Sequence, residues 1–562
     1  MNDIKQVTVG SYLGQRLVEA GLRDFFTVPG DFTLVLLDQL IATPGLRMIS
    51  CCNELNAGYA ADGYARTSGF SAAVVTYTVG GLSLINAVAG AYGDDLSMLA
   101  VSGGPNSNDA HDHHRIHHTI GELDLYQAER CYAPVVAAVF NIRHLEDAAR
   151  MIDEAIVTCL SKKKPVYLEI ACNLTGLNIP APTSMLFPIP APKSDPSALA
   201  AAVDAATKRI NAAVKPAIVV GVKIRPAQAG DAVLGLVNAL GAAVATTPDA
   251  KGIFSEDHSN FIGTYWSEVS SPDCSEIIES SDCQVLLGVQ QTDYTTTGWT
   301  ALYKTDSAIN VGIDQVSMPE GVFSQVYMAD FLNALAAKVS KKDASMQEYQ
   351  RYKEPVAPTP IAAATDILNL RELRRQIQGI IHSETSLISE TGDSWFNGQA
   401  MHLPKGASYH VQMQYGSIGW STGAALGVAL ASNADGRVIA LIGDGSFQMT
   451  AQELSTMIRY QVNPIIFLMN NGGYTIEVEL HDGPYNQIKN WDYAGLMNVF
   501  NAGDGKGLGL KVKTAGDLSA AISQAIAHRG GPVIIECPLS RDDCSKALAE
   551  WGSHVAKANA RV

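Results

Sequence analysis

The sequence predicts an α/β protein of three domains, each a mostly parallel sheet flanked by helices. At 562 residues the chain exceeds one hydrophobic core, since a domain takes roughly 100 to 200 residues. Short β-branched runs alternate with Ala/Leu-rich helical stretches along the chain. Two proline-rich stretches, around Pro180–Pro196 and Pro355–Pro360, favour extended linkers. The predicted domains therefore span residues 1–180, 196–350 and 361–562.

Each predicted domain has its own buried strands. The first has DFFTVPG, AAVVTYTVG, MLAVSGG and KPVYLEI, the second PAIVVGV, CQVLLGVQ and INVGID, and the third RVIALIGDGS, PIIFLMNN and GPVIIEC. Such continuous apolar runs are typical of parallel strands covered on both faces. Ligands bind such sheets beyond the carboxyl ends of the strands, so the loops there are the candidate site. Whether the first and third domains share one topology is left open by the sequence.

The composition excludes several partners. The net charge of −16, from 40 basic and 56 acidic side chains, repels nucleic acid. Nine cysteines without a CxxC pair indicate buried, reduced thiols of a cytoplasmic protein, and the N-terminus lacks the features of a signal peptide. The uncharged run from Gly69 to Gly93 has the length of a membrane span. Its polar residues and five glycines fit a strand, a Gly80-Gly81 turn and a buried helix better, so no membrane partner is expected.

Two glycine-rich turns carry the strongest chemical signal. Gly443, Asp444, Gly445 and Ser446 follow the strand RVIALI, and about 27 residues further on the turn Asn470–Gly473 follows PIIFLM. Either turn alone is usually only a tight turn. Together, at one sheet edge, they offer close backbone approach and helix amides to a diphosphate. Magnesium takes a few protein oxygens besides those of phosphates, and one carboxylate, one amide oxygen and one carbonyl suit it.

These turns resemble the signature of thiamine-diphosphate enzymes, which begins GDG and ends NN. Long matching segments include CCNELNAGYAADGYAR, KKPVYLEIACN, ETGDSWFN, GDGSFQMTAQE and NNGGYTIEVELHDGPYNQIKNWDY. They are closest to the pyruvate decarboxylases of the 2-keto acid decarboxylase family. The resemblance implies a lyase that converts pyruvate to acetaldehyde and carbon dioxide with thiamine diphosphate and Mg²⁺, the metal held by Asp444, Asn471 and Gly473. It also implies a homo-oligomer, at least a dimer and usually a tetramer, with each site built from two subunits.

The resemblance also assigns catalytic residues. Glu54, which alone suggests a role near a helix N-cap, would hydrogen-bond the aminopyrimidine ring of the cofactor. Five of the thirteen histidines lie between His111 and His118, where no complete zinc-ligand set is present, and a solvated loop explains His111, His113 and His114. The other two, with two acids, match the family's proton-transfer residues, although their division of labour stays open. These four residues are Asp31, His117, His118 and Glu477, with His117 orienting its neighbours.

The remaining assignments concern the cofactor and the substrate. The implied cofactor-binding residues are Glu54, Thr391, Gly416, Ile418, Gly443, Asp444, Gly445, Ser446, Asn471, Gly473, Tyr474, Thr475 and Ile476. Ile418 would wedge between the two cofactor rings. The implied substrate pocket consists of Asp31, His118, Tyr294, Trp395, Ile476 and Glu477. Trp395 is expected to narrow this pocket to pyruvate.

Three alternatives compete with this interpretation. A bulkier substrate such as phenylpyruvate or indolepyruvate would need a wider pocket. A flavin-binding relative of acetolactate synthase is disfavoured because VVGVKIRP lacks GxGxxG. An inactive binding protein is disfavoured because Glu54, Asp444, Asn471 and Glu477 are all present. Some relatives carry an activating cysteine pair where this chain has PAIVVGVKIRPAQ, so we expect hyperbolic kinetics.

Overall fold

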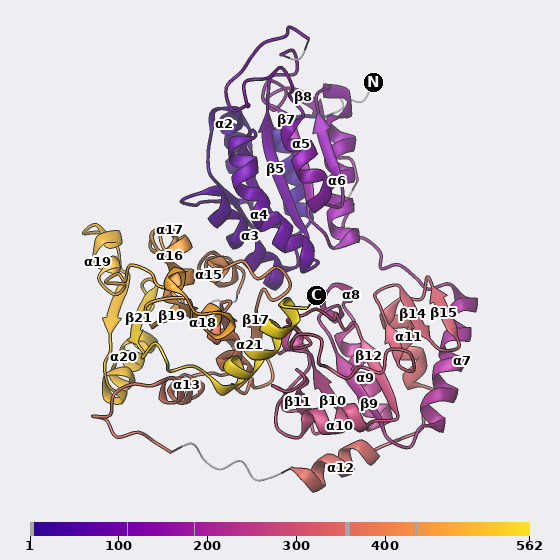
Figure 1. The fold of residues 1–562 in the computed structure, drawn as a ribbon. Helices are drawn as coiled ribbons and strands as arrows, with labels where there is room; N and C mark the ends of the chain where they lie inside the picture. Colours follow the sequence, from indigo (N-terminus) through magenta and orange to yellow (C-terminus); the bar gives the residue numbers. More distant parts are fainter. Residues whose placement is uncertain (1–4, 110, 185, 354–359, 433–435, 562) are drawn as a thin grey trace.

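A computed structural model describes residues 5–109, 111–184, 186–353, 360–432 and 436–561. Three sheets, each flanked by helices, form three domains, and this confirms the predicted α/β fold (Figure 1). The first domain lies at the top of the view, with the middle and third domains side by side below it.

The first domain has a six-stranded sheet, all parallel, in the order β3-β2-β4-β5-β7-β6. Its strands are β2 (Asp24–Thr27), β3 (Arg47–Ser50), β4 (Ser71–Thr76), β5 (Met98–Gly104), β6 (Val139–Ile142) and β7 (Val166–Ala171), with β1 (Gln6–Thr8) and β8 (Asn178–Pro180) paired separately. Its helices are α1 (Val9–Glu19), α2 (Leu34–Ile41), α3 (Glu54–Ser68), α4 (Val79–Gly93), α5 (Gln127–Tyr132) and α6 (Ala148–Lys162), with short 3-10 turns η1 (Asp31–Thr33), η2 (Ala133–Val135) and η3 (Leu145–Asp147).

The middle domain has a seven-stranded sheet in the order β11-β10-β9-β12-β13-β14-β15, in which β14 runs antiparallel to both its neighbours β13 and β15 and the other pairs are parallel. Its strands are β9 (Pro216–Val220), β10 (Ala243–Thr246), β11 (Phe261–Thr264), β12 (Cys283–Leu287), β13 (Ile309–Val311), β14 (Gln315–Met318) and β15 (Gly321–Ser324). Its helices are α7 (Pro196–Ala212), α8 (Ile224–Ala227), α9 (Gly230–Leu240), α10 (Cys274–Ser280), α11 (Met328–Ala336) and α12 (Ala344–Tyr352), with η4 (Pro248–Ala250).

The third domain has a six-stranded parallel sheet in the order β17-β16-β18-β19-β21-β20. Its strands are β16 (Thr385–Ser389), β17 (Ser408–His410), β18 (Arg437–Gly443), β19 (Ile465–Asn470), β20 (Leu508–Lys511) and β21 (Val533–Pro538). Its helices are α13 (Leu370–Gln378), α14 (Asp393–Gln399), α15 (Trp420–Ala431), α16 (Asp444–Thr450), α17 (Glu453–Arg459), α18 (Thr475–Leu480), α19 (Leu496–Asn501), α20 (Ala515–Ala527) and α21 (Lys546–Asn559), with η5 (Pro484–Asn486).

The first and third sheets share one topology, which answers the question left open by the sequence. Numbered along the chain within each sheet, the spatial order of strands is 2-1-3-4-6-5 in both. The chain therefore passes from β2 to β3 on one side and from β3 to β4 on the other, so that the strand order reverses between β2 and β4. The same reversal occurs between β16 and β18. Such a switch point opens a crevice at the carboxyl ends of the strands, where ligands bind. Each of these two domains thus offers one candidate half of a site.

Helices α3 and α15 hold the first and third domains together through close backbone contact. A Cβ atom on Gly427 would lie 1.8 Å from the Ala60 carbonyl oxygen, and one on Gly63 would lie 2.3 Å from that of Ala424. Only glycine fits at such a crossing. The start of α3, where Glu54 lies, is thereby fixed to the third domain.

The uncharged run Gly69–Gly93 and the two proline-rich stretches were also assigned a structure from the sequence. The run Gly69–Gly93 forms strand β4 and helix α4, but Gly80 and Gly81 lie in the first turn of α4, so the predicted turn at this pair is wrong. The first proline-rich stretch joins β8 to α7 without regular helix or strand among its described residues, and residues 354–359 of the second lie outside the described part.

All nine cysteines are free, yet Cys52 and Cys131 are exposed, so the expected burial is wrong for these two.

Among the described residues, no helix has the length and apolar character needed to cross a membrane.

Candidate active site

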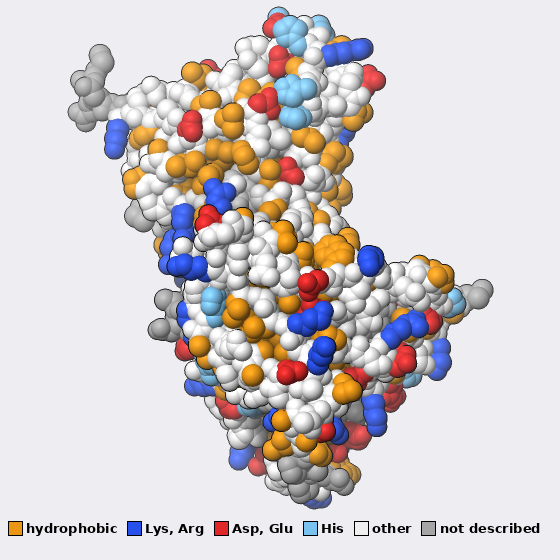
Figure 2. Space-filling view, turned by 90° about the vertical axis from the view of Figure 1, so that its left-hand side faces the viewer, with side chains coloured by type: hydrophobic (Ala, Val, Ile, Leu, Met, Phe, Trp, Pro, Cys, Tyr) orange, Lys and Arg blue, Asp and Glu red, His pale blue; other side chains and the backbone are white. Residues whose placement is uncertain are grey.

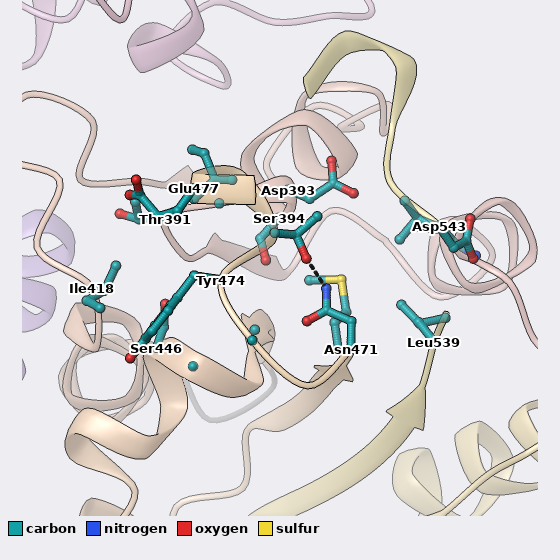
Figure 3. Close-up of a pocket in the computed structure, with 18 residues that line it drawn as sticks. Thr391, Asp393, Ser394, Ile418, Ser446, Asn471, Tyr474, Glu477, Leu539 and Asp543 are labelled. Atoms are coloured by element: carbon teal, nitrogen blue, oxygen red, sulfur yellow. Dashed lines mark hydrogen bonds between the residues drawn. The ribbon is translucent and has the colours of Figure 1, made fainter. Parts of the chain in front are cut away.

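A cavity of about 200 Å³ lies at the carboxyl ends of the third-domain strands (Figure 3). The predicted residues that line it are Thr391, Ile418, Gly443, Gly445, Ser446, Asn471, Gly473, Tyr474, Thr475, Ile476 and Glu477. The sequence interpretation missed seven others, namely Leu370, Gly392, Asp393, Ser394, Met469, Leu539 and Asp543. Asp393 and Ser394 could have been found, because they lie two and three residues after Thr391, at the start of α14.

Asp444 is the first residue of helix α16, directly after strand β18, and its side chain is fully buried. Its Oδ1 accepts a hydrogen bond from the Gly445 amide at 2.8 Å, and its Oδ2 accepts one from the Gly472 amide at 2.6 Å. Burial raises the pKa of Asp444 to about 6, against the lowering effect of these amides. No lysine or arginine of the described chain forms an ion pair with it. A buried carboxylate in this state would be stabilised by a bound cation.

The side-chain amide of Asn471 lies between Asp444 and the Gly473 carbonyl. With the Asn471 Nδ2 donating to Thr475 Oγ1, the Asn471 Oδ1 lies 3.3 Å from Asp444 Oδ1 and 3.1 Å from the Gly473 carbonyl oxygen. Oxygens this close repel one another, unless the amide turns over so that its NH₂ group donates or a cation lies between them. One carboxylate, one amide and one carbonyl oxygen make a hard-cation ligand set.

Glycines shape the same wall of the cavity. A Cβ atom on Gly445 would lie 2.5 Å from the ring of Tyr474, which covers the first turn of α16, and one on Gly473 would lie 2.0 Å from the Asn486 carbonyl oxygen. Side chains larger than glycine would not fit at either position, and Gly445 and Ser446 of the first turn of α16 line the cavity, where a helix N-terminus attracts an anion such as a diphosphate.

A second group of polar residues lies at the switch point of the first domain. Asp31 begins η1 directly after β2, and its Oδ2 lies 2.6 Å from His117 Nε2 while its Oδ1 lies 3.3 Å from His118 Nε2. Although desolvation acts to raise it, the hydrogen bond to His117 and the charges of both histidines lower the pKa of Asp31. His117 also packs on Phe32, with ring centroids 4.9 Å apart. Imidazoles and a carboxylate so arranged can exchange protons with a bound molecule.

The neighbouring histidines behave as expected for a solvated loop. His111 and His114 are exposed and pair with Asp112 and Asp109. Figure 2 shows histidine and acidic side chains gathered at the end of the first domain that is farthest from the other two domains.

Glu54 is the first residue of α3, and the N-cap is its neighbour Asn53, whose side chain accepts from the Asn56 amide at 2.9 Å. The Glu54 carboxylate is half-buried, and its Oε1 lies 3.2 Å from the place of a Cβ atom on Gly80. A larger residue at Gly80 would crowd this carboxylate. Glu54 is thus left available for a ligand rather than used as a cap.

The structure does not bring all predicted residues into one cavity. Asp31, Glu54, His117 and His118 of the first domain are absent from its lining among the described residues. Trp395 is also absent from the lining, since it is fully buried with its ring 5.7 Å from that of Tyr294. Gly416 lies beside this pair, because a Cβ atom there would be 3.9 Å from the Tyr294 ring. The substrate-pocket roles of Tyr294 and Trp395 stay predictions.

Comparison with known sequences identifies the class. Three domains of one family match along the chain: the N-terminal TPP binding domain of thiamine pyrophosphate enzymes at residues 7–128, their central domain at 203–336 and their C-terminal TPP binding domain at 391–537. The chain therefore belongs to the thiamine pyrophosphate enzyme family, in agreement with the two glycine-rich turns and the matching first and third sheets.

Within this family the chain is similar over nearly its whole length to pyruvate decarboxylases. It is 49% identical to "Pyruvate decarboxylase 2" of Oryza sativa subsp. japonica over 99% of this chain and 92% of the relative. It is also 49% identical to "Pyruvate decarboxylase 3" of Arabidopsis thaliana and "Pyruvate decarboxylase 1" of Pisum sativum, each over 99% of this chain and 94% of the relative.

Proposed function

We propose that this protein decarboxylates pyruvate to acetaldehyde and carbon dioxide with thiamine diphosphate and Mg²⁺. The observation that carries the proposal is the grouping of Asp444, the Asn471 side-chain amide and the Gly473 carbonyl at the start of α16, in a chain 49% identical to pyruvate decarboxylases. The relatives are named for pyruvate, which favours this substrate over phenylpyruvate or indolepyruvate.

Asp444, Asn471 and the Gly473 carbonyl would hold the metal. Mg²⁺ usually binds through few protein groups and completes its shell with phosphate oxygens and water. Gly445 and Ser446, in the first turn of α16, would then face the diphosphate. The cation would neutralise both the Asp444 carboxylate and the diphosphate, so the metal and the diphosphate would stabilise each other's binding.

The first-domain residues and Glu477 would handle protons. When bound, thiamine diphosphate would supply a nucleophilic ring carbon and a positively charged ring that accepts the electron pair left by carbon dioxide. Glu54 would accept a hydrogen bond from the aminopyrimidine ring. Asp31, His118 and Glu477 would deliver a proton to the product carbon and remove one from its hydroxyl group. His117, 2.6 Å from Asp31, would hold that carboxylate in place.

We also propose that a second copy of the chain completes each site, in a cytoplasmic dimer that pairs into a tetramer. One chain's cavity is lined by the third domain alone, while the acid and imidazole groups lie at the switch point of the first. Helix α4, which covers Glu54 through Gly80, exposes Val79 and Leu82. Hydrophobic side chains also gather on the face of the first domain seen in Figure 2. A second copy would cover such apolar surface.

The test is acetaldehyde release from pyruvate, measured with and without thiamine diphosphate and Mg²⁺. Turnover should require both and should be faster with pyruvate than with phenylpyruvate at equal concentration. Turnover that persists after complete removal of both, or a preference for phenylpyruvate, would contradict the proposal.

A further inference from the structure

Glu390 is a buried carboxylate that has no role in the proposed binding of metal and cofactor or in the proposed proton transfers. It lies between the last residue of β16 and the cavity residue Thr391, and its side chain is fully buried. No lysine or arginine of the described chain pairs with it. A buried carboxylate without a cation costs several kcal/mol unless hydrogen bonds compensate it. Its position beside the cavity suggests that this cost serves the site.

Four hydrogen bonds compensate the charge. Glu390 Oε1 accepts from the Thr391 amide at 2.8 Å. Its Oε2 accepts from the Gly419 amide at 3.1 Å, the Ser421 amide at 3.1 Å and the Ser421 hydroxyl at 2.6 Å. Burial raises the pKa of Glu390, and these bonds oppose the rise. All four partner groups act as donors, so a proton on Oε1 would face the N–H group of Thr391 instead of an acceptor. The arrangement fits the ionised form.

The same carboxylate caps helix α15. The N-cap residue of this helix is Gly419, with φ +87°, which has no side chain to accept from the first amides. Glu390, which directly follows β16, accepts from these amides instead. A negative charge at the N-terminus of a helix is also favoured by the helix dipole. The Gly419 carbonyl in turn accepts from Thr450 Oγ1 at 2.7 Å. Helix α16, which ends at Thr450, begins with Asp444.

These bonds connect three walls of the cofactor cavity. Thr391 follows β16, Ile418 directly precedes Gly419, and α16 contributes Gly445 and Ser446 to the lining. We propose that Glu390 is a positioning residue whose carboxylate fixes Ile418 relative to Thr391, so that the cavity accepts thiamine diphosphate in one productive shape. This inference rests on the proposed function. A purely structural role would not need a charge, because a neutral side chain of the same volume is cheaper to bury.

The principal test is Glu390→Gln, which keeps the shape but turns one acceptor into a donor. We expect the dissociation constant of thiamine diphosphate, measured by calorimetry with Mg²⁺, to rise about tenfold or more, as expected for losing a hydrogen bond to a charged group. At saturating cofactor, kcat should fall by a similar factor of about ten, while KM for pyruvate stays within about twofold.

The matched control is Glu372→Gln in α13. Glu372 is also buried, but it is held by Arg375 and Gln376 and does not line the cavity. It should lower the unfolding temperature without changing cofactor affinity or kcat. Ser421→Ala, which removes the 2.6 Å bond alone, should weaken cofactor binding less than Glu390→Gln.

Two results would overturn the inference. One is a Glu390→Gln protein with a lower unfolding temperature but unchanged cofactor affinity and kcat. The other, decisive if that variant does not fold, is a Ser421→Ala protein that binds the cofactor and turns over as the unmodified protein does. Failure of the proposed function is distinguishable, because the unmodified protein would then lack cofactor-dependent turnover while calorimetry still compares affinities.

Discussion

Asp444 and Asn471 follow adjacent parallel strands, and the side-chain amide group of Asn471 lies 3.3 Å from Asp444 Oδ1. Strands β18 and β19 are in register up to the pair Gly443 and Met469, which places both turns at the same sheet edge. The two side chains are therefore held together by the sheet itself rather than by flexible loops. With its NH₂ group toward Asp444, the Asn471 amide donates to the carboxylate, and with its oxygen there it would share a cation with it.

Asp444→Asn should abolish co-binding of Mg²⁺ and thiamine diphosphate, because it removes the only charged group of the proposed ligand set. Metal analysis and calorimetry on the purified variant check this. Asp249→Asn is the matched control, since Asp249 is a half-buried aspartate whose pKa is also raised to about 6 but lies in the middle domain. Full metal and cofactor occupancy in the Asp444 variant would rule it out as a ligand.

The raised pKa of Asp444 also predicts the pH dependence of the metal-free protein. The folded-state pKa of about 6 exceeds that of an unfolded aspartate, so the folded state binds the proton more tightly. The stability that this group contributes therefore falls as pH rises toward 6. At pH 7, Asp444→Asn should raise the free energy of unfolding of the metal-free protein by about 1 to 3 kcal/mol. Urea titrations at pH 5 and pH 7 measure this, and a gain that is larger at pH 5 would contradict the assignment.

Glu54→Gln should leave the fold intact and slow turnover at least about 100-fold, the usual effect of losing a proton-transfer partner. Hydrogen–deuterium exchange at the reactive carbon of the bound cofactor should slow in parallel. Glu276→Gln provides the control, because Glu276 is also in the first turn of a helix but is exposed in the middle domain. Unchanged exchange in the Glu54 variant would remove it from the mechanism.

A mixture of Glu54→Gln and Asp444→Asn chains tests whether two copies build each site. Each variant alone should be inactive. After unfolding and refolding together in equal amounts, random pairing should restore about a quarter of the sites, because an intact site needs Glu54 from one chain and Asp444 from the other. If both residues act within one chain, the mixture will stay inactive.

Trp395→Ala should lower activity on pyruvate and raise the relative activity on aromatic 2-keto acids. Trp395 is fully buried against Tyr294, so its removal leaves a void and costs about 3 to 5 kcal/mol of stability. The ratio of kcat/KM for pyruvate and phenylpyruvate is the decisive quantity, because it does not depend on the fraction of folded protein. Trp395→Phe, which leaves a smaller void, should give an intermediate ratio. An unchanged ratio would assign Trp395 to the core alone.

Pyruvate saturation should be hyperbolic, with a Hill coefficient near 1. The segment without cysteine is fixed to the first domain, since Lys223 forms an ion pair with Asp95 and Arg225 donates to the Asp94 carbonyl at 2.8 Å. Initial rates over a wide pyruvate range check this. A lag phase or a sigmoidal curve would show that substrate activates the protein by another route.

Local signals in the sequence carried the prediction of the fold and of the cofactor turns. Continuous apolar runs identify buried parallel strands, and the turns at Gly443 and Asn470 each follow such a run directly. Most residues of the cavity wall lie within a few positions of a strand end, so they can be predicted from the segments that follow the predicted strands. Asp393 and Ser394 were missed because β16 was not recognised as a strand.

The sequence by itself determined three α/β domains and the residue types of the cofactor site, because both depend on patterns within a few neighbouring residues. Only the tertiary structure decided which distant residues meet. Asp31 and His117 are 86 residues apart, and Glu390 and Ser421 are 31 apart, yet each pair is hydrogen-bonded. It also decided that Trp395 is in the core and that Gly80 lies in the first turn of a helix beside Glu54. Such contacts depend on strand order and helix packing, which no local sequence pattern specifies.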